Sequence, residues 1–323
     1  MIMSANVESM FYVSNEENER FVPWHGLGTP VESAKTSKEA IELAGLNWTV
    51  SQKEMYAGDI KVPGYFANMR DSDNSILGVV GKRYQIVQNA DAFDFTDSLV
   101  GEGCTYETAG SLFGGKRIWL LAKMPKTTIL GDDVEPFICF SNSHDGSTAI
   151  KVAMTPIRVV CNNTLNVALK GAKRTWSAKH TGSISSKMSE AKYTLGLAQQ
   201  YMDELAIVSD QLANTRVTEE DTYKLLCSLF PTEDDMSDRR KANVEEQKKQ
   251  FIICTMAPDL KKFDGTAYQL LQAATDFSTH YKPMRTTENF KDNNLARAID
   301  GSSVVDQTYL NMLQLMNKKR VIV

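Results

Sequence analysis

The sequence predicts an α+β protein: a mixed or antiparallel sheet with hairpins and helices, followed by a helical C-terminal region. Short apolar runs bounded by Gly, Asn, Asp and Ser fill the chain up to about residue 182. After that point, apolar residues recur every three to four positions, as on the buried face of a helix. With 323 residues, 42% of them hydrophobic, the chain is long enough for one large domain or two ordinary ones.

In the first half, two glycine turns predict hairpins. Gly114-Gly115 and Asp145-Gly146 each join apolar runs, and glycine takes a positive φ without strain. The strands expected are 48–56, 64–70, 76–80, 105–112, 117–124, 134–140, 147–155 and 157–160. Asn89 is expected to cap a helix over 90–100, and residues 162–164 to open a short helix that runs to Leu169.

The second half predicts helices over 183–212, 219–230, 238–256, 266–280, 293–299 and 305–317. The first of these has a long apolar stripe, which either packs into the core or forms a subunit interface. The expected organisation is an N-terminal segment (1–29), an α/β core with a basic tract (30–182) and a helical region (183–323).

The charge distribution is the most informative functional feature. No Asp or Glu occurs from Gly146 to Ser189, while this tract of 44 residues holds seven Lys and Arg. It carries about +7, which leaves about −11 for the rest of a chain whose net charge is −4. Cations that gather without counter-charges usually meet a polyanion, and nucleic acid is the commonest one.

Cations and aromatic rings in and near this tract are the candidate contacts. Cations follow phosphates, and an aromatic ring stacks on an unpaired base. The alternative is a solvated surface on which these side chains contact nothing. The candidate nucleic-acid-binding residues are Lys116, Arg117, Lys151, Arg158, Lys170, Lys173, Arg174, Trp176, Lys179, His180 and Lys187.

Several of these residues have structural alternatives. Lys116 and Arg117 form either a cationic hairpin tip that contacts nucleic acid or an ordinary exposed turn. Arg158 lies in an apolar run, so it either binds a phosphate or pairs with a carboxylate such as Asp145. His144 and Asp145 fit a hairpin turn better than a catalytic pair.

Other classes of protein lack their sequence signatures. The N-terminus has no basic and apolar signal-peptide regions, and no apolar run is long enough to span a membrane. The five cysteines never occur as a CxxC pair, so neither zinc nor another cofactor is expected, and reduced thiols suit the cytoplasm. The phosphate loop GxxxxGK[ST] is missing, which argues against an ATP-driven enzyme.

An ordered set of motifs resembles one family. The motifs are WHGLG at 24–28, GVVGxxY at 78–84, GGKRIW at 114–119, SHDGS at 143–147, TPxRVVCxNTL at 155–165 and His180-Thr181. This set is similar to the phage/plasmid-like proteins built on the domain of unknown function 932. The resemblance implies a mobile-element origin and assigns no activity. More distantly, the element order resembles single-strand annealing proteins of the Rad52/Redβ type.

The function expected is a non-enzymatic, ATP-independent protein that binds and anneals single-stranded DNA in recombination or replication, as a homo-oligomeric ring or filament. The alternative is a protein-interaction factor of a mobile element, such as an inhibitor of host defence or a structural component. A metal-dependent nuclease is a third hypothesis, but it lacks a carboxylate cluster among these motifs.

Overall fold

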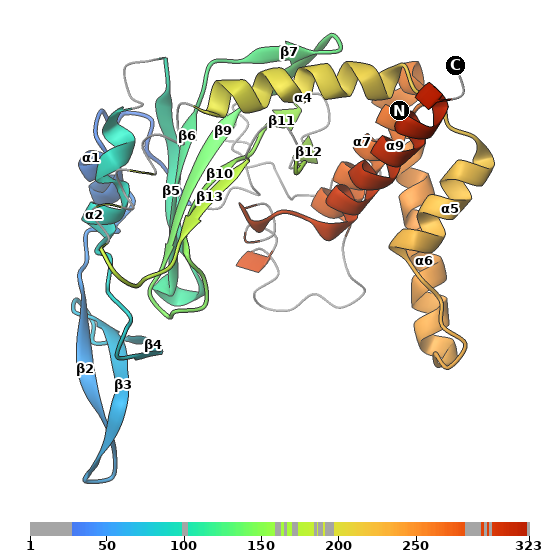
Figure 1. The fold of residues 1–323 in the computed structure, drawn as a ribbon. Helices are drawn as coiled ribbons and strands as arrows, with labels where there is room; N and C mark the ends of the chain where they lie inside the picture. Colours follow the sequence, from blue (N-terminus) through green and yellow to red (C-terminus); the bar gives the residue numbers. More distant parts are fainter. Residues whose placement is uncertain are drawn as a thin grey trace, which may run out of the picture.

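The computed structural model describes residues 28–98, 103–158, 163–164, 167–169, 174–183, 186, 190, 197–281, 292–293, 296 and 299–321. It confirms the α+β prediction, because antiparallel sheets form the first half and helices the second. In Figure 1 the central sheet stands upright. A second, elongated sheet extends downward on its left, and most helices of the second half of the chain lie on its right.

The central sheet has six antiparallel strands in the order β1-β5-β6-β9-β10-β13. Their bounds are β1 (Thr29–Pro30), β5 (Thr105–Leu112), β6 (Arg117–Lys123), β9 (Phe137–Ser143), β10 (Ile150–Met154) and β13 (Thr175–Ala178). The predicted hairpin at the double glycine is confirmed, since β5 and β6 pair across it. Both glycines adopt positive φ angles there, 71° at Gly114 and 94° at Gly115.

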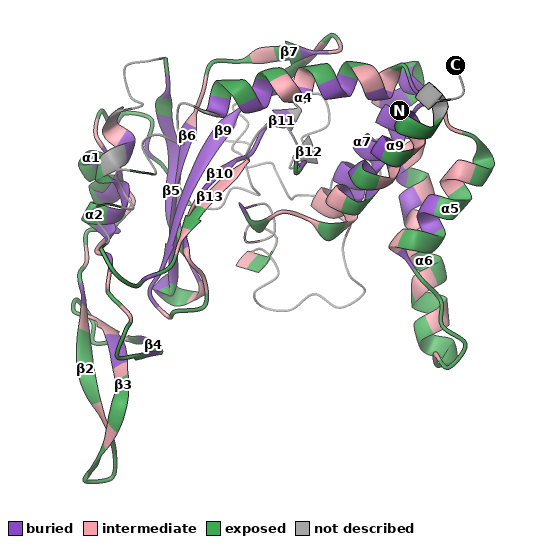
Figure 2. Ribbon diagram, viewed as in Figure 1, coloured by how far each residue is buried: buried purple, intermediate pink, exposed green. Residues whose placement is uncertain are grey.

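Both faces of this sheet are covered. Ile118, Leu120 and Phe140 belong to the larger hydrophobic cluster, which also takes in side chains of α1 (Ser37–Leu43) and α2 (Asn89–Phe93). Trp119 and Cys139 point to the other face and pack in a smaller cluster with Ile299. Figure 2 shows the result, with β5, β6 and β9 buried along most of their length.

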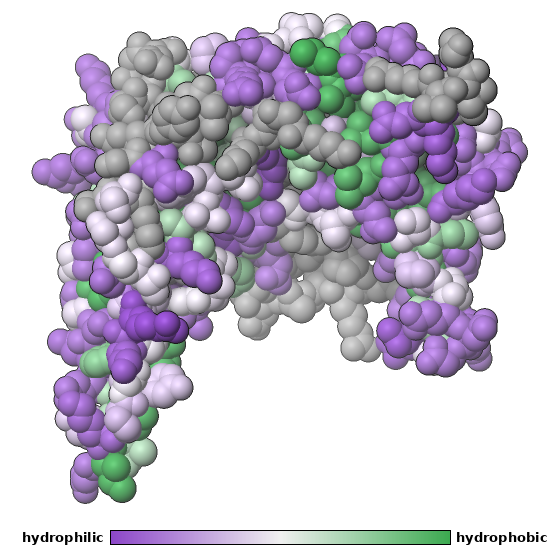
Figure 3. All heavy atoms as spheres, in the orientation of Figure 1, coloured by the Kyte–Doolittle hydropathy of each residue, from purple (hydrophilic) through white to green (hydrophobic). Residues whose placement is uncertain are grey.

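Strands β2 (Val50–Ala57), β3 (Ile60–Arg70) and β4 (Ile76–Gly81) form a separate three-stranded sheet, here called the β-arm. Its upper part rests on the turn after β9, where the Asn68 side-chain amide donates to the His144 carbonyl oxygen at 2.6 Å. Gly78 packs so closely on Asp145 that an added Cβ would lie 2.5 Å from the Asp145 Cα. The lower part of the β-arm extends into solvent (Figures 1 and 3).

A third sheet of four short strands has the order β12-β11-β8-β7. The strands are β7 (Thr127–Ile129), β8 (Asp132–Glu135), β11 (Ile157–Arg158) and β12 (Asn163–Thr164).

The helical part contains α4 (Leu197–Ala213), α5 (Glu219–Leu229), α6 (Asp238–Thr255), α7 (Ala267–His280) and α9 (Ser303–Val321). Helix α7 is buried along most of its length and contacts both α6 and α9. The larger hydrophobic cluster includes residues of these helices as well as of the central sheet, so the sheet and the helices share one core. None of the described helices is long and apolar enough to cross a membrane.

Several local predictions are wrong. The strand expected over 134–140 is two strands, because Pro136 lacks the N–H that a continuous ladder requires. The short helix expected up to Leu169 is absent, since Asn163–Thr164 forms β12 and residues 167–169 have no regular structure.

Asn89 lies inside α2 and is not its N-cap, because its amide donates to the carbonyl oxygens of Leu46 and Trp48. The helix expected over 90–100 is therefore offset and short. The α-helical part ends at Phe93 and a 3₁₀ turn, Asp94–Ser98, follows it. Of the strand predicted over 157–160, Ile157–Arg158 forms β11 of the third sheet, and residues 159–160 lie outside the described residues. Most of 183–196 and of 293–299 lies outside the described residues.

Candidate nucleic-acid interface

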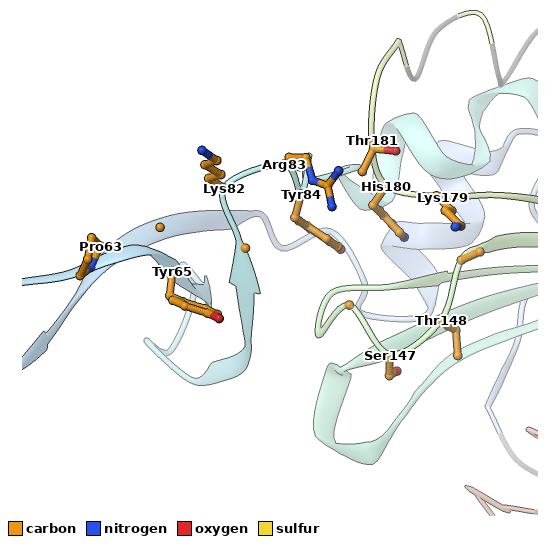
Figure 4. A pocket seen from close by; sticks show the side chains of 14 residues that line it. Pro63, Tyr65, Lys82, Arg83, Tyr84, Ser147, Thr148, Lys179, His180 and Thr181 are labelled. Atoms are coloured by element: carbon orange, nitrogen blue, oxygen red, sulfur yellow. The ribbon is translucent and has the colours of Figure 1, made fainter.

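A cleft of about 890 Å³ opens between the β-arm and the central sheet. The residues that line it come from four separate stretches of the chain (Figure 4). They are Pro63, Gly64, Tyr65, Gly81, Lys82, Arg83, Tyr84, Gly146, Ser147, Thr148, Ala149, Lys179, His180 and Thr181. The family-like motifs GVVGxxY, SHDGS and His180-Thr181 thus meet at one place.

Backbone hydrogen bonds hold these stretches together. The Tyr84 N–H donates to the Gly81 carbonyl oxygen at 2.9 Å and closes a turn at the end of β4. The next amide, that of Gln85, donates to the His180 carbonyl oxygen at 2.8 Å. The turn after β4 is therefore tied to the segment after β13, which brings Lys82 and Arg83 to the same cleft as Lys179.

Two stacked rings form one wall of the cleft. The rings of Tyr84 and His180 lie 4.7 Å apart, centroid to centroid, with an interplanar angle of 14°. The Tyr84 hydroxyl donates to the Ser143 carbonyl oxygen at 2.6 Å, which fixes the ring against the end of β9. Burial, and then the nearby Asp145 carboxylate, raise the pKa of Tyr84, so the hydroxyl remains a donor at neutral pH.

The cleft is positively charged. Lys82, Arg83 and Lys179 are all exposed, and none of the residues that line the cleft is an Asp or a Glu. The adjoining carboxylate, Asp145, accepts hydrogen bonds from the Ser147 amide at 2.9 Å and the Ser147 hydroxyl at 2.6 Å. A lining that contains three cations and no carboxylate suits an anionic ligand.

A buried polar layer lies behind the cleft. His144 is fully buried, and this burial, followed by the proximity of His180, lowers its pKa to about 4, so the imidazole is neutral at pH 7. The amide group of Asn89 donates to two carbonyl oxygens, so its Oδ1 must accept from His144 Nε2, which lies 2.8 Å away.

This assignment leaves His144 Nδ1 as an acceptor. The side-chain oxygens of Asn68 and Asn142 are also buried acceptors without a protein partner in the described part of the chain. These buried acceptor atoms are suited to accept hydrogen bonds from buried water. His144 is thus a structural residue, as the turn interpretation expected.

The predicted contact residues divide into groups. Lys179 and His180 line the cleft. Lys116 is exposed at the β5–β6 turn, outside the lining of the cleft. Lys170, Lys173 and Lys187 lie outside the described residues, and Arg158 is placed only as part of β11.

The prediction that Arg117 lies at an exposed hairpin tip is wrong. Its side chain is only 4% exposed, and its Nε donates to the Ser141 hydroxyl at 2.7 Å. Both terminal nitrogens reach the Asp300 carboxylate, at 3.1 and 3.2 Å. Lys151 reaches the same carboxylate at 2.5 Å, so it too is held by a structural ion pair. Burial raises the pKa of Asp300, but its hydrogen bonds to Arg117 and Lys151 outweigh this and lower it overall.

Arg174 and Trp176 also make structural contacts, in addition to the binding role that the sequence predicts. The Arg174 guanidinium donates to the Met154 carbonyl oxygen at 3.1 Å, and burial lowers its pKa. Trp176 lies opposite Val152 in the sheet and is half-buried, with its ring packed against the larger hydrophobic cluster. The apparent excess of charge in the tract is partly balanced by a carboxylate far away in the sequence, that of Asp300.

The side chains that line the cleft offer cations, hydroxyls and aromatic rings. Elsewhere, burial raises the pKa of the Cys139 thiol to about 12, which keeps it protonated at neutral pH. Among the described residues, no three His, Cys, Asp or Glu side chains are grouped so that they would hold a metal ion.

The cationic and aromatic residues of the cleft that the sequence analysis did not identify as contacts are Tyr65, Lys82, Arg83 and Tyr84. A signal was present, since Lys82-Arg83-Tyr84 places two adjacent cations and an aromatic residue directly after a strand. The family-like motif GVVGxxY includes Tyr84 but does not specify Lys82 and Arg83.

No curated protein and no solved structure matches this chain. A family model does match, over residues 76–300, and its description is "Domain of unknown function (DUF932)". The match includes five of the six motifs completely, as well as most of the residues that line the cleft. Because the matched region covers more than half of the sequence, the chain belongs to the family of the domain of unknown function 932.

Proposed function

We propose that this protein binds single-stranded nucleic acid in the cleft between the β-arm and the central sheet, without nucleotide hydrolysis. The observation that carries the proposal is the meeting of Lys82, Arg83 and Lys179 in a cleft whose lining contains no carboxylate. Cations in such a groove neutralise backbone phosphates, and the open groove leaves bases accessible for pairing. Annealing of complementary strands in recombination or replication of a phage or plasmid, within the host cytoplasm, is the activity that fits such binding.

The proposal is tested by fluorescence anisotropy with a labelled single-stranded oligonucleotide over a series of salt concentrations. If three phosphates are neutralised, log K falls against log salt with a slope of about −2, at ~0.7 per phosphate on single strands. Lys82→Glu, Arg83→Glu and Lys179→Glu are each expected to weaken binding about tenfold and to reduce the slope by ~0.7.

Lys249→Glu is the matched control. It makes the same change in net charge at an exposed position on α6, on the far side of the molecule from the cleft (Figure 1). It is expected to alter affinity less than twofold. Binding that does not depend on salt, or an equal loss in the cleft variants and the control, would remove the cleft from the interface.

A second candidate function is contact with other proteins, including further copies of this chain. The observation that favours it is the set of exposed apolar side chains on the β-arm: Tyr56, Ile60 and Ile76 are 57%, 75% and 65% exposed. Apolar patches of this kind often mark interaction sites. Light scattering measures the oligomeric state of the protein, and a pull-down with and without nuclease distinguishes protein partners from nucleic acid.

A further inference from the structure

One ring in the cleft has no packing role. Tyr65, on β3, is one of the residues that line the cleft, and it is 54% exposed. Within the described residues, its ring stacks on no other ring and its hydroxyl makes no hydrogen bond. An exposed tyrosine on a surface strand is common, so its surroundings decide whether it has a binding role.

Two of the positions next to Tyr65 are glycines. Gly81 is its cross-strand partner on β4, and Gly64 precedes it on β3. A Cβ added at Gly81 would meet nothing within 4 Å, so no side chain of β4 covers Tyr65 at the position opposite it. In a typical antiparallel pair, a cross-strand side chain would cover an aromatic ring at this position.

The opposite wall of the cleft is rigid. Tyr84 is stacked on His180 and tied to β9 through its hydroxyl, so its position is fixed before any ligand arrives. Lys82 and Arg83 follow β4 and Lys179 follows β13, so cations reach the cleft from two different elements (Figure 4). A flat apolar group carried between two phosphates therefore has both a surface to stack on and charges to anchor it.

We propose that the cleft takes one unpaired nucleobase, which stacks on the ring of Tyr65 and faces the wall formed by Tyr84 and His180. This inference rests on the proposed function and adds a reason why single strands would bind more tightly than duplexes. In a duplex the faces of the bases are covered by their neighbours, so Tyr65 contributes only when the base is unpaired. Stacking of one base on an aromatic ring corresponds to roughly a 5- to 140-fold gain in affinity, or about 1–3 kcal/mol.

The experiment compares an intact single-stranded oligonucleotide with an abasic one of the same length, which keeps the phosphates and lacks the bases. Tyr65→Ala is expected to weaken binding of the intact strand at least fivefold and to leave binding of the abasic strand within twofold. Tyr65→Phe keeps the ring and is expected to bind the intact strand within twofold of the wild type. Tyr56→Ala is the matched control, because Tyr56 is an equally exposed tyrosine of the β-arm outside the cleft.

The outcomes separate the two proposals. If the wild type binds the intact and abasic strands equally well, the base-stacking inference is wrong while phosphate binding stands. Equal losses for the two strands in Tyr65→Ala, or the same loss in Tyr56→Ala, also overturn it. If the wild type binds neither strand at low salt, the proposed function itself fails and the inference with it.

Discussion

The ion pairs of Asp300 allow a quantitative prediction for the variant Asp300→Asn. This change leaves the shape of the side chain nearly unaltered and removes the counter-charge of two cations, of which Arg117 is 4% exposed and Lys151 20% exposed. Breaking a buried ion pair from one side costs roughly 3–5 kcal/mol. The Asp300 side chain is itself 38% exposed, so solvent screening reduces this figure, and we expect a loss of about 2 kcal/mol in the free energy of unfolding.

Urea denaturation at pH 7 measures this loss. Glu220→Gln is the control, because Glu220 pairs with Lys224 on the surface of α5 and both side chains are mostly exposed. The control is expected to change stability by less than ~0.5 kcal/mol. The low pKa of Asp300 means that its contribution is present above pH 3.8 and is lost as the pH falls below that value, so the two proteins should converge in acid. A loss at pH 7 no larger than that of the control would refute the structural role of Asp300.

The remaining predictions concern the β-arm and helix α7. Gly78→Ala places a Cβ 2.5 Å from the Asp145 backbone and is expected to lower the free energy of unfolding in urea by roughly 1–3 kcal/mol. Gly81→Ala is the control, because nothing lies within 4 Å of its new Cβ, and it should change stability by less than ~0.5 kcal/mol. Equal effects of the two variants would contradict the close contact between Gly78 and Asp145. Burial raises the pKa of Asp276 to about 6, so the folded state favours its protonated form and this group should add stability as the pH falls from 7 to 4, by up to about 3 kcal/mol. Asp276→Asn should remove that rise from the stability profile, and an unchanged profile would assign the pH dependence to another group, such as His280, 3.9 Å away.

The sequence was most informative where structure depends on near neighbours. The hairpin of β5 and β6 follows from two apolar runs around Gly114-Gly115, and helices α5, α6 and α7 follow from their apolar period and from caps such as Thr218. The failures also have local causes. Pro136 divides one apolar run between two sheets, and Asn89 uses its amide on tertiary partners and not on a helix end.

The site was only partly predictable, because tertiary contacts decide which cations pair with a carboxylate and which line the cleft. Lys151 and Lys179 belong to the same carboxylate-free tract, yet one is neutralised by Asp300 and the other lines the cleft. Nothing near either lysine in the sequence distinguishes them. Likewise, Lys82 and Arg83 join the site through the hydrogen bond between Gln85 and His180, which links residues 95 positions apart along the chain.

The long sequence separation of the Asp300 ion pairs has a consequence for how the protein is made. A ribosome produces Arg117 and Lys151 long before Asp300, which follows them by 183 and 149 residues. Until residue 300 emerges, this face of the sheet contains cations whose burial would be strongly unfavourable. We therefore expect the nascent sheet to remain open on that side, so that a chain interrupted before residue 300 keeps a hydrated, protease-accessible surface and only the extended chain closes it.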